Sequence, residues 1–311
     1  MSFDSNKPVV SVVIVSYNVE KYLIRCVESL LHHKCNVPFE IIVVDNNSHD
    51  NSVLSLQQKF PEIHIIQSEA NFGFAAANNR GIACAKGEYF LLLNPDTIVE
   101  DNAIEELFAF ISTHLSAGAV GSCLKNPDGS FQVSCFPFPT LTRELWRLLH
   151  LDKLISFGLY PQITWDRNSP RKCDVIQGTS IMVRKSVWEA LGGLDEAFFM
   201  YSEEVDFCYR MSKAGFECYW VPTSRVIHFG GQSTSQYAKE MFLQLYHAKI
   251  QFFKKHHGEF AGEIYKFILL IASLVRIFFS PINDWMNPEE KAQQKKIREN
   301  YRSLISSLSQ F

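Results

Sequence analysis

The chain has 311 residues, of which 20% are charged and 47% hydrophobic, and its formal net charge is -3. This length suffices for one large α/β domain with an additional segment, and the composition is that of a globular protein. The small negative charge argues against a nucleic-acid partner. The eight cysteines include no CxxC pair, which disfavours a zinc site and indicates reduced core thiols. With no signal-peptide pattern in the first eight residues, we expect a cytoplasmic protein.

Apolar runs and helical periodicity alternate along the first 115 residues. The apolar runs predict buried strands at 9–15, 40–45, 63–66 and 89–93. Apolar residues at helical spacing predict helices at 20–33, 51–60, 75–85 and 101–114. Strands that alternate with helices are typical of βαβ units, so we expect a mostly parallel central sheet flanked by helices.

Polar residues follow three of these strands. They are Ser16-Tyr17-Asn18, Asp45-Asn46 and Asn94-Pro95-Asp96. Right-handed crossovers bring the carboxyl ends of parallel strands to one edge, where open α/β sheets bind ligands. A hard oxygen ligand such as Asp96 suits Mg²⁺ or Mn²⁺ bridging phosphates. Taken alone, Asn-Pro-Asp is equally consistent with a simple turn.

The middle of the chain mixes clear and unclear elements. We predict strands at 119–124, at 175–183 around Gln177, and at 220–228. A helix at 184–191 should end at Gly192-Gly193. Residues 131–170 are rich in aromatics and proline; there we expect a helix near 141–155 within a mobile region over the acceptor side.

An acidic cluster, Glu203, Glu204 and Asp206, follows Ser202 and opens a helix predicted from about 203. One interpretation is that these acids only complement the helix dipole. The alternative is a catalytic base, because large apolar neighbours raise the pKa of a carboxyl group. His228 ends a strand; a lone histidine is usually structural, but this one could ligate the metal.

The pattern becomes helical after residue 235. Residues 238–257 are amphipathic, and residues 267–279 are intensely apolar but short for a membrane span and contain Arg276. Basic residues flank this run. Two interpretations stay open: an interfacial helix on an anionic bilayer, or a core helix packed under the catalytic domain.

Taken together, the motifs resemble those of family 2 inverting glycosyltransferases with the GT-A fold. The segments that carry the resemblance are Val12–Asn18, Ile42–Ser48, Asn71–Ala75 with Asn78 and Gly81, Leu93–Thr97, Gly192–Asp206 and His228. The resemblance covers roughly residues 8–235 in unbroken order. Within the family, the motif sequences are most similar to those of bacterial rhamnosyltransferases that use dTDP-L-rhamnose. The resemblance implies a Rossmann-like catalytic domain over 1–235, with a nucleotide-sugar half to about 125 and an acceptor half beyond, followed by a C-terminal helical region at 236–311.

The resemblance also implies roles for individual residues. Those that would bind the nucleotide sugar are Ser16, Tyr17, Asn18, Asp45, Asn71, Asn78, Asn94 and Gln177. Asp45 would accept a hydrogen bond from the imide of uracil or thymine. Asn94 and Asp96 stand at the DXD metal motif with an amide in place of the first acid, so Asp96 and His228 would hold the Mg²⁺ or Mn²⁺. Glu204 would be the catalytic base, with Asp206 as the alternative, because the family's Glu-Asp pair is Glu203-Glu204 here.

The resemblance implies a dTDP- or UDP-sugar donor and a saccharide acceptor, and the basic and apolar C-terminal segment fits a polyprenyl-linked saccharide. That segment also indicates a peripheral location on the inner face of the cytoplasmic membrane; a homo-oligomer is compatible with the sequence. Two alternatives stay open: a UDP-hexose or UDP-HexNAc transferase, and a non-catalytic nucleotide-sugar-binding protein of the same fold. A dinucleotide-dependent dehydrogenase is disfavoured because no GxGxxG follows the first strand.

Overall fold

The computed structural model describes residues 7–32, 35–151, 157–279 and 288–311. The chain forms two compact units. Unit 1 holds residues up to Phe138, Pro161–Phe199 and Glu203–Ser233; unit 2 holds Pro139–Tyr160, Met200–Ser202 and Thr234–Phe311. The domain boundary expected at residue 235 stays a prediction.

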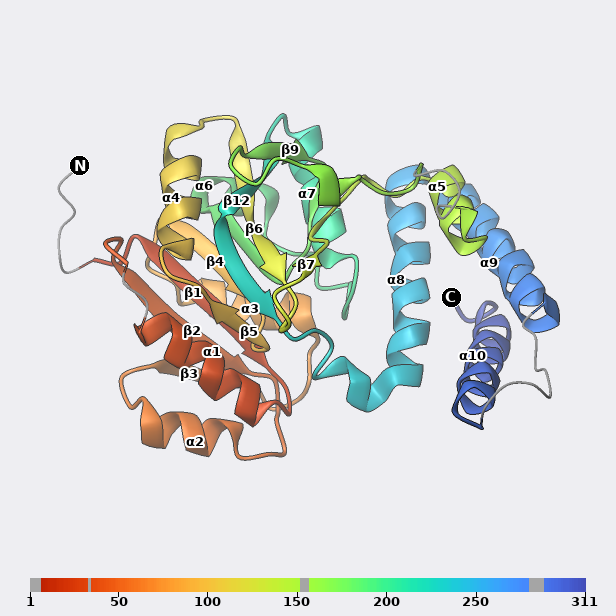
Figure 1. The fold of residues 1–311 in the computed structure, drawn as a ribbon, viewed down its shortest axis with the longest axis horizontal. Helices are drawn as coiled ribbons and strands as arrows, with labels where there is room; N and C mark the ends of the chain where they lie inside the picture. Colours follow the sequence, from red (N-terminus) through yellow and green to blue (C-terminus); the bar gives the residue numbers. More distant parts are fainter. Residues whose placement is uncertain (1–6, 33–34, 152–156, 280–287) are drawn as a thin grey trace. The chain divides into compact units, whose positions relative to one another are not determined.

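Unit 1 is built on a mixed, mostly parallel sheet with strand order β3-β2-β1-β4-β11-β6-β12-β5 (Figure 1). The first four strands are mutually parallel: β1 (Val10–Ser16), β2 (Phe39–Asp45), β3 (His64–Gln67) and β4 (Tyr89–Leu93). The others are β5 (Thr97–Val99), β6 (Ala117–Lys125), β11 (Ser180–Arg184) and β12 (Glu217–His228). Because β11 runs antiparallel to both β4 and β6, strands β6 and β12 again point the same way as β4.

This topology brings several strand ends to one edge. The carboxyl ends of β1, β2, β4, β6 and β12 lie there, together with the beginning of the reversed strand β11. The Asn94 backbone amide, just after β4, donates to the Thr179 carbonyl, just before β11, at 2.9 Å. The segment around Gln177 therefore reaches the same edge as Asp96, although it lies some 80 residues further along the chain.

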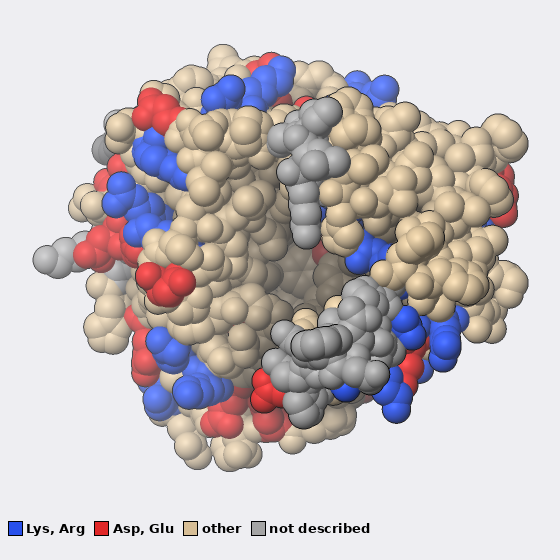
Figure 2. Space-filling model, turned by 45° about the vertical axis from the view of Figure 1, so that its right-hand side comes forward, with Lys and Arg blue, Asp and Glu red and all other residues tan. Residues whose placement is uncertain are grey.

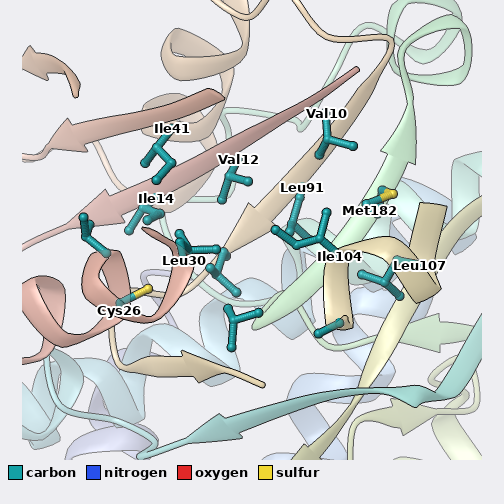
Figure 3. Close-up of a cluster of buried hydrophobic side chains, with 14 of the residues drawn as sticks. Val10, Val12, Ile14, Cys26, Leu30, Ile41, Leu91, Ile104, Leu107 and Met182 are labelled. Carbon is teal, nitrogen blue, oxygen red and sulfur yellow. The ribbon is translucent and has the colours of Figure 1, made fainter. Parts of the chain in front are cut away.

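Helices cover both faces of the sheet. Side chains of α1 (Glu20–His32), α2 (Ser52–Lys59) and α4 (Ala103–Thr113) share one apolar core with alternate residues of β1, β2 and β4, such as Val12 and Leu91 (Figure 3). On the other face, α3 (Phe74–Ala83) approaches so closely that a Cβ on Gly81 would lie 2.5 Å from Val13 Cγ1. Trp188 of α6 (Lys185–Leu191) packs on Phe90 there and also contacts α7 (Glu203–Lys213).

Unit 2 is helical and has its own apolar core. It contains α5 (Leu141–Leu148), α8 (Ala238–His257), α9 (Glu259–Phe279) and α10 (Pro288–Ser307). Its core includes Tyr246, Ile250, Tyr265, Leu269 and Leu304. The Glu144 carboxylate is buried among them and accepts bonds from Lys249 Nζ at 2.7 Å and from Tyr265 Oη at 3.0 Å. No helix among the described residues is long and apolar enough to cross a membrane.

The structure confirms the predicted strands and helices of the first 115 residues within a few positions. The single strand predicted at 175–183 is wrong. It is split into β10 (Val175–Ile176), which pairs with β8 (Cys135–Phe136), and β11. The apolar helix begins at Glu259 rather than at 267, and the helix expected near 141–155 ends at Leu148. The last part of that expectation, 152–155, lies outside the described residues. Short elements that were not predicted are β5, β7 (Phe131–Gln132), β8, β9 (Arg171–Cys173) and the 3₁₀ turns Gln162–Thr164 and Thr234–Tyr237.

Candidate active site

Asp96 and His228 meet at the end of β4. The chain turns through Asn94-Pro95-Asp96 into β5, which pairs antiparallel with the end of β12 so that Thr97 lies opposite His228. The Phe229 backbone amide donates to the Asp96 carbonyl at 2.9 Å. His228 Nε2 then lies 3.3 Å from Asp96 Oδ1, and both side chains are buried. Two residues that lie far apart in sequence are thus fixed in contact by strand pairing.

Gln132 sets the orientation of the His228 ring. Its Oε1 atom lies 2.7 Å from His228 Nδ1, and its Nε2 donates to Asn126 Oδ1 at 2.9 Å. The amide oxygen can only accept, so Nδ1 carries the hydrogen, and Nε2 is the ring nitrogen that faces Asp96. A lone pair facing a carboxylate oxygen at this distance is repulsive unless a proton or a cation lies between them.

This pair fits a divalent cation held jointly with a ligand. Magnesium is usually bound by one or two protein carboxylates plus substrate phosphates and water. Asp96 and His228 supply two donors, and the described residues include no cluster of three or more His, Cys, Asp or Glu that could cage an ion. The donor set therefore leaves coordination positions for phosphate oxygens. Asn94 is half-buried, and its carbonyl accepts from Thr97 Oγ1 at 2.7 Å.

Two buried polar atoms at the ends of β1 and β2 have no protein partner. Ser16 and Asp45 are opposite each other in the parallel register. Asp45 Oδ2 accepts from the Ser48 amide at 3.0 Å, but Asp45 Oδ1 and Ser16 Oγ are buried without a hydrogen-bond partner in the described structure. An unsatisfied buried acceptor is costly, so a ligand donor at this place would be bound favourably.

The neighbouring residues of the predicted donor site have structural bonds. Asn18 adopts a left-handed backbone with φ of 54°, and its Oδ1 accepts from the His49 amide at 2.7 Å. Tyr17 is half-buried beside it. Asn78 is buried in α3, where its Nδ2 donates to the Phe74 carbonyl at 2.9 Å.

A buried amide network shapes the 71–74 loop. Asn46 Nδ2 donates to Asn71 Oδ1 at 2.7 Å and to the Gly73 carbonyl, while Asn46 Oδ1 accepts from the Phe72 amide at 3.1 Å. Gly73 has a φ of 86°, and the next amide, that of Phe74, donates to the Phe199 carbonyl at 2.7 Å. Asn46 was not predicted as a site residue, although its place directly after Asp45 at a strand end was the available signal.

Glu203 and Glu204 open helix α7 with buried, unpaired oxygens. Glu203 Oε2 and Glu204 Oε2 have no hydrogen-bond partner in the described structure. Burial raises the pKa of both carboxyl groups, and the negative charge of Glu204 raises that of Glu203 further. A Cβ on Gly178 would lie 3.7 Å from Glu204 Cβ and from Phe74 Cε1. The half-buried Glu204 thus lies against the loop that also carries Gln177, whose amide donates to the Ser134 carbonyl at 2.8 Å.

Asp206 has a different environment. It is fully buried, and its Oδ2 accepts from Arg210 Nε at 2.8 Å, one turn along α7. The same guanidinium donates to the Leu191 and Gly193 carbonyls, both at 2.7 Å, at the end of α6. Asp206 therefore orients an arginine that ties two helices together, whereas Glu204 retains an unused acceptor.

The predicted residues come together as three contact groups on one sheet edge: Ser16 with Asp45, Asp96 with His228, and Glu204 with the 177–179 loop. The bond from the Asn94 amide to Thr179 connects the second group to the third. The fold is an open α/β sheet whose carboxyl edge carries two candidate cation ligands, Asp96 and His228, and a buried carboxylate, Glu204. This is the arrangement that the sequence resemblance to nucleotide-sugar glycosyltransferases implies.

Comparison with known proteins agrees. The family model described as glycosyl transferase family 2 matches residues 11–189. The N-acetylglucosaminyl-diphospho-decaprenol L-rhamnosyltransferase of Mycobacterium tuberculosis is 30% identical over 247 residues, which cover 73% of this chain and 78% of the relative. Rhamnosyltransferase WbbL of Escherichia coli is 26% identical, with 75% and 88% covered. The mannosyltransferase PcManGT of Pyrobaculum calidifontis, solved with GDP-Man and Mn²⁺, superposes with a TM-score of 0.56 at 14% identity, covering 99% of this chain and 86% of that one.

The chain belongs to glycosyl transferase family 2. It is a glycosyltransferase that uses a nucleotide-sugar donor, and its fold is of the GT-A type.

Proposed function

We propose that the enzyme transfers L-rhamnose from dTDP-L-rhamnose to a polyprenyl-linked saccharide in the synthesis of a cell-surface polysaccharide. Two relatives that match about three quarters of the chain are named rhamnosyltransferases, and one of those names specifies a decaprenol-linked substrate. The observation that carries the proposal is the buried contact between Asp96 and His228 at the carboxyl end of β4. It provides two ligands for a cation at the place where an open α/β sheet binds a diphosphate.

We assign the donor-binding role to the residues at the ends of β1, β2 and β4. Asp45 Oδ1, which is buried and has no hydrogen-bond partner among the described residues, would accept the imide N–H of thymine or uracil. Asp96 and His228 would hold Mg²⁺ or Mn²⁺, which when bound offsets the negative charge of the diphosphate leaving group. Gln132 keeps the His228 ring in the orientation that this role requires.

We assign the catalytic base to Glu204. Its raised pKa lies closer to neutrality than that of an ordinary glutamate, which improves proton acceptance from a hydroxyl group. Glu204 removes the proton of the acceptor hydroxyl while the oxygen forms a bond to the anomeric carbon from the face opposite the diphosphate. The bond to the diphosphate breaks, so the configuration inverts and a single base suffices. Asp206 stays the alternative base, but its pairing with Arg210 favours a structural role.

The test compares Glu204→Gln with Asp206→Asn and with Glu189→Gln, an exposed site on α6 that serves as the matched control. Glu204→Gln should lower the transfer rate by at least roughly 10²-fold, the typical contribution of a general base. The binding of dTDP with Mn²⁺, measured by calorimetry, should stay near that of the wild type. Transfer that survives Glu204→Gln but is lost in a folded Asp206→Asn variant would move the base to Asp206.

A donor panel tests the sugar. dTDP-L-rhamnose, UDP-glucose and UDP-N-acetylglucosamine are offered separately, and transfer is followed by mass spectrometry of the product. We expect product only from dTDP-L-rhamnose. Transfer from a UDP-sugar would replace the donor and leave the mechanism intact, while nucleotide binding without turnover of any donor would support a non-catalytic binding protein.

A further inference from the structure

Helix α9 has one buried face and one exposed apolar face. The buried face packs Tyr265, Leu269 and Ala272 into the core of unit 2. The exposed face recurs at helical spacing, and we call these residues the α9 stripe: Phe260, Phe267, Ile271, Leu274, Val275, Phe278 and Phe279, with exposed fractions of 79, 62, 40, 36, 37, 76 and 80%. Single exposed apolar side chains are ordinary, but a contiguous row of this kind marks an interaction surface.

Charged groups on this helix turn away from the stripe or are neutralised. Arg276 Nη2 donates to the Leu148 carbonyl at 3.1 Å, and its guanidinium lies over the Tyr301 ring at 5.3 Å. Lys266 pairs with Glu263 at 2.9 Å. Figure 2, in which the right-hand side of Figure 1 comes forward, shows a wide area without Lys, Arg, Asp or Glu in its upper right.

The net positive charge of residues 236–311 favours an anionic partner for the α9 stripe. Residues 236–311 contain 11 Lys and Arg against 7 Asp and Glu, whereas residues 1–235 contain 19 against 26. Three of these basic residues, Lys295, Lys296 and Arg302, are exposed on α10. An anionic bilayer attracts basic side chains within about 10 Å of its surface. A second copy of the chain would instead bring two positively charged segments together.

We propose that the α9 stripe docks on a bilayer that contains anionic lipid, with α9 lying in the headgroup region and the exposed basic residues of α10 near the lipid phosphates. The helix lies on the membrane rather than through it, because no described helix can span a bilayer. An aromatic and aliphatic face on a segment with an excess of lysine and arginine is typical of interfacial helices. This surface would bring the enzyme to a lipid-linked acceptor. Only the identity of that acceptor rests on the proposed function; membrane binding itself does not.

The test is co-sedimentation of the full chain with vesicles of phosphatidylcholine alone or with added phosphatidylglycerol. Wild type should bind the mixed vesicles, and added salt should weaken the binding. Phe267→Ser with Phe278→Ser should lower the partition coefficient at least roughly tenfold, because two exposed phenyl rings no longer enter the interface. Leu115→Ser in unit 1, where Leu115 is 83% exposed, is the matched control and should bind as wild type does.

A second double variant separates the contribution of charge from that of apolar contact. Lys295→Gln combined with Lys296→Gln should reduce binding to the mixed vesicles and make that binding less dependent on salt. The proposal is overturned if the wild-type protein binds neither vesicle type, or if the double Phe variant binds as strongly as the wild type does. A lipid-independent dimer that the double Phe variant abolishes assigns the stripe to a second copy instead. Calorimetry with dTDP and Mn²⁺ keeps this outcome distinct from a failure of the donor site.

Discussion

At the scale of single residues, the contact between Gln132 and His228 tests the cation site. In Gln132→Leu, Nδ1 of His228 loses its acceptor, so the ring is no longer held with Nε2 toward Asp96. Loss of such a supporting bond typically costs roughly 10- to 100-fold in metal affinity. We therefore expect weaker Mn²⁺ binding in the presence of dTDP, measured by electron paramagnetic resonance.

Gln132→Glu is the matched control, because a carboxylate oxygen can accept the same Nδ1 hydrogen. It should retain most of the affinity for Mn²⁺. Equal losses in both variants would show that His228 does not depend on this bond.

The raised pKa of Glu204 predicts where transfer is lost in acid. The base must be ionised, and burial favours its protonated form, so the rate falls as pH drops through a pKa above the ordinary value of 4.5. The acid limb of the pH–rate profile should lie above that value. Burial alone raises the pKa of Glu204, whereas the charge of Glu204 further raises that of Glu203, so Glu203 is protonated over this limb and Glu203→Gln should leave the limb in place. A wild-type limb at the ordinary value would mean that Glu204 is solvated during catalysis.

At the scale of elements, Gly73 lies in the loop that connects Asn71 to helix α3. Its φ of 86° disfavours any other residue, and a Cβ there would lie 2.2 Å from the Phe199 carbonyl oxygen. Gly129 offers a matched control, because its φ of 83° is equally positive while no atom lies within 4 Å of its Cβ position. Gly129→Ala should cost about 1 kcal/mol in the free energy of unfolding.

Gly73→Ala should cost clearly more and should also weaken dTDP binding, because the loop must move away from Phe199. Chemical denaturation and calorimetry measure the two effects. Similar losses of stability in the two variants would show that the loop relaxes without strain.

Strands and helices are predicted well from the sequence where a single local pattern, such as a continuous apolar run, is enough to identify them. Strands β1, β2 and β4 are apolar on both faces, so continuous runs of residues such as Val12 and Leu91 indicate them directly. The direction of β11 could not be predicted, because an apolar run says nothing about which way a strand crosses the sheet. The split at Gln177–Thr179 was missed for a related reason: β10 pairs with the distant strand β8.

The same distinction applies to the site. Asp45 and His228 end their strands and Asp96 follows β4 in the turn to β5, so the position of each along the chain signals the shared edge. Gln132 lies in a two-residue strand whose place depends on pairing with β6, and no local pattern marks it. Asp206 differs from Glu204 in sequence by lying four residues before Arg210, a helical spacing that indicates the ion pair the structure shows.

At the scale of the whole molecule, the two units have separate cores, and a buried acid in each has its pKa shifted in the opposite direction. Burial raises the pKa of Glu204 in unit 1. In unit 2, burial also disfavours the Glu144 carboxylate, but Lys249 and Arg147 outweigh it and lower the pKa. Glu144 therefore stabilises unit 2 above the ordinary value of 4.5, and this contribution is lost as pH falls through the lowered pKa. Glu204 contributes in the opposite sense, since its ionisation opposes folding above that value.

Lys249→Met tests whether the units respond separately. It leaves the Glu144 carboxylate buried without its nearest cation, 2.7 Å away, and breaking a buried pair in this way typically costs 3–5 kcal/mol. Hydrogen exchange at pH 7 should become faster for amides of α5, α8 and α9, while amides of β1 and β4 keep their protection. Glu144→Gln combined with Lys249→Met removes the stranded charge and should recover part of the loss. Faster exchange in both units to the same extent would show instead that the two cores unfold as one cooperative structure.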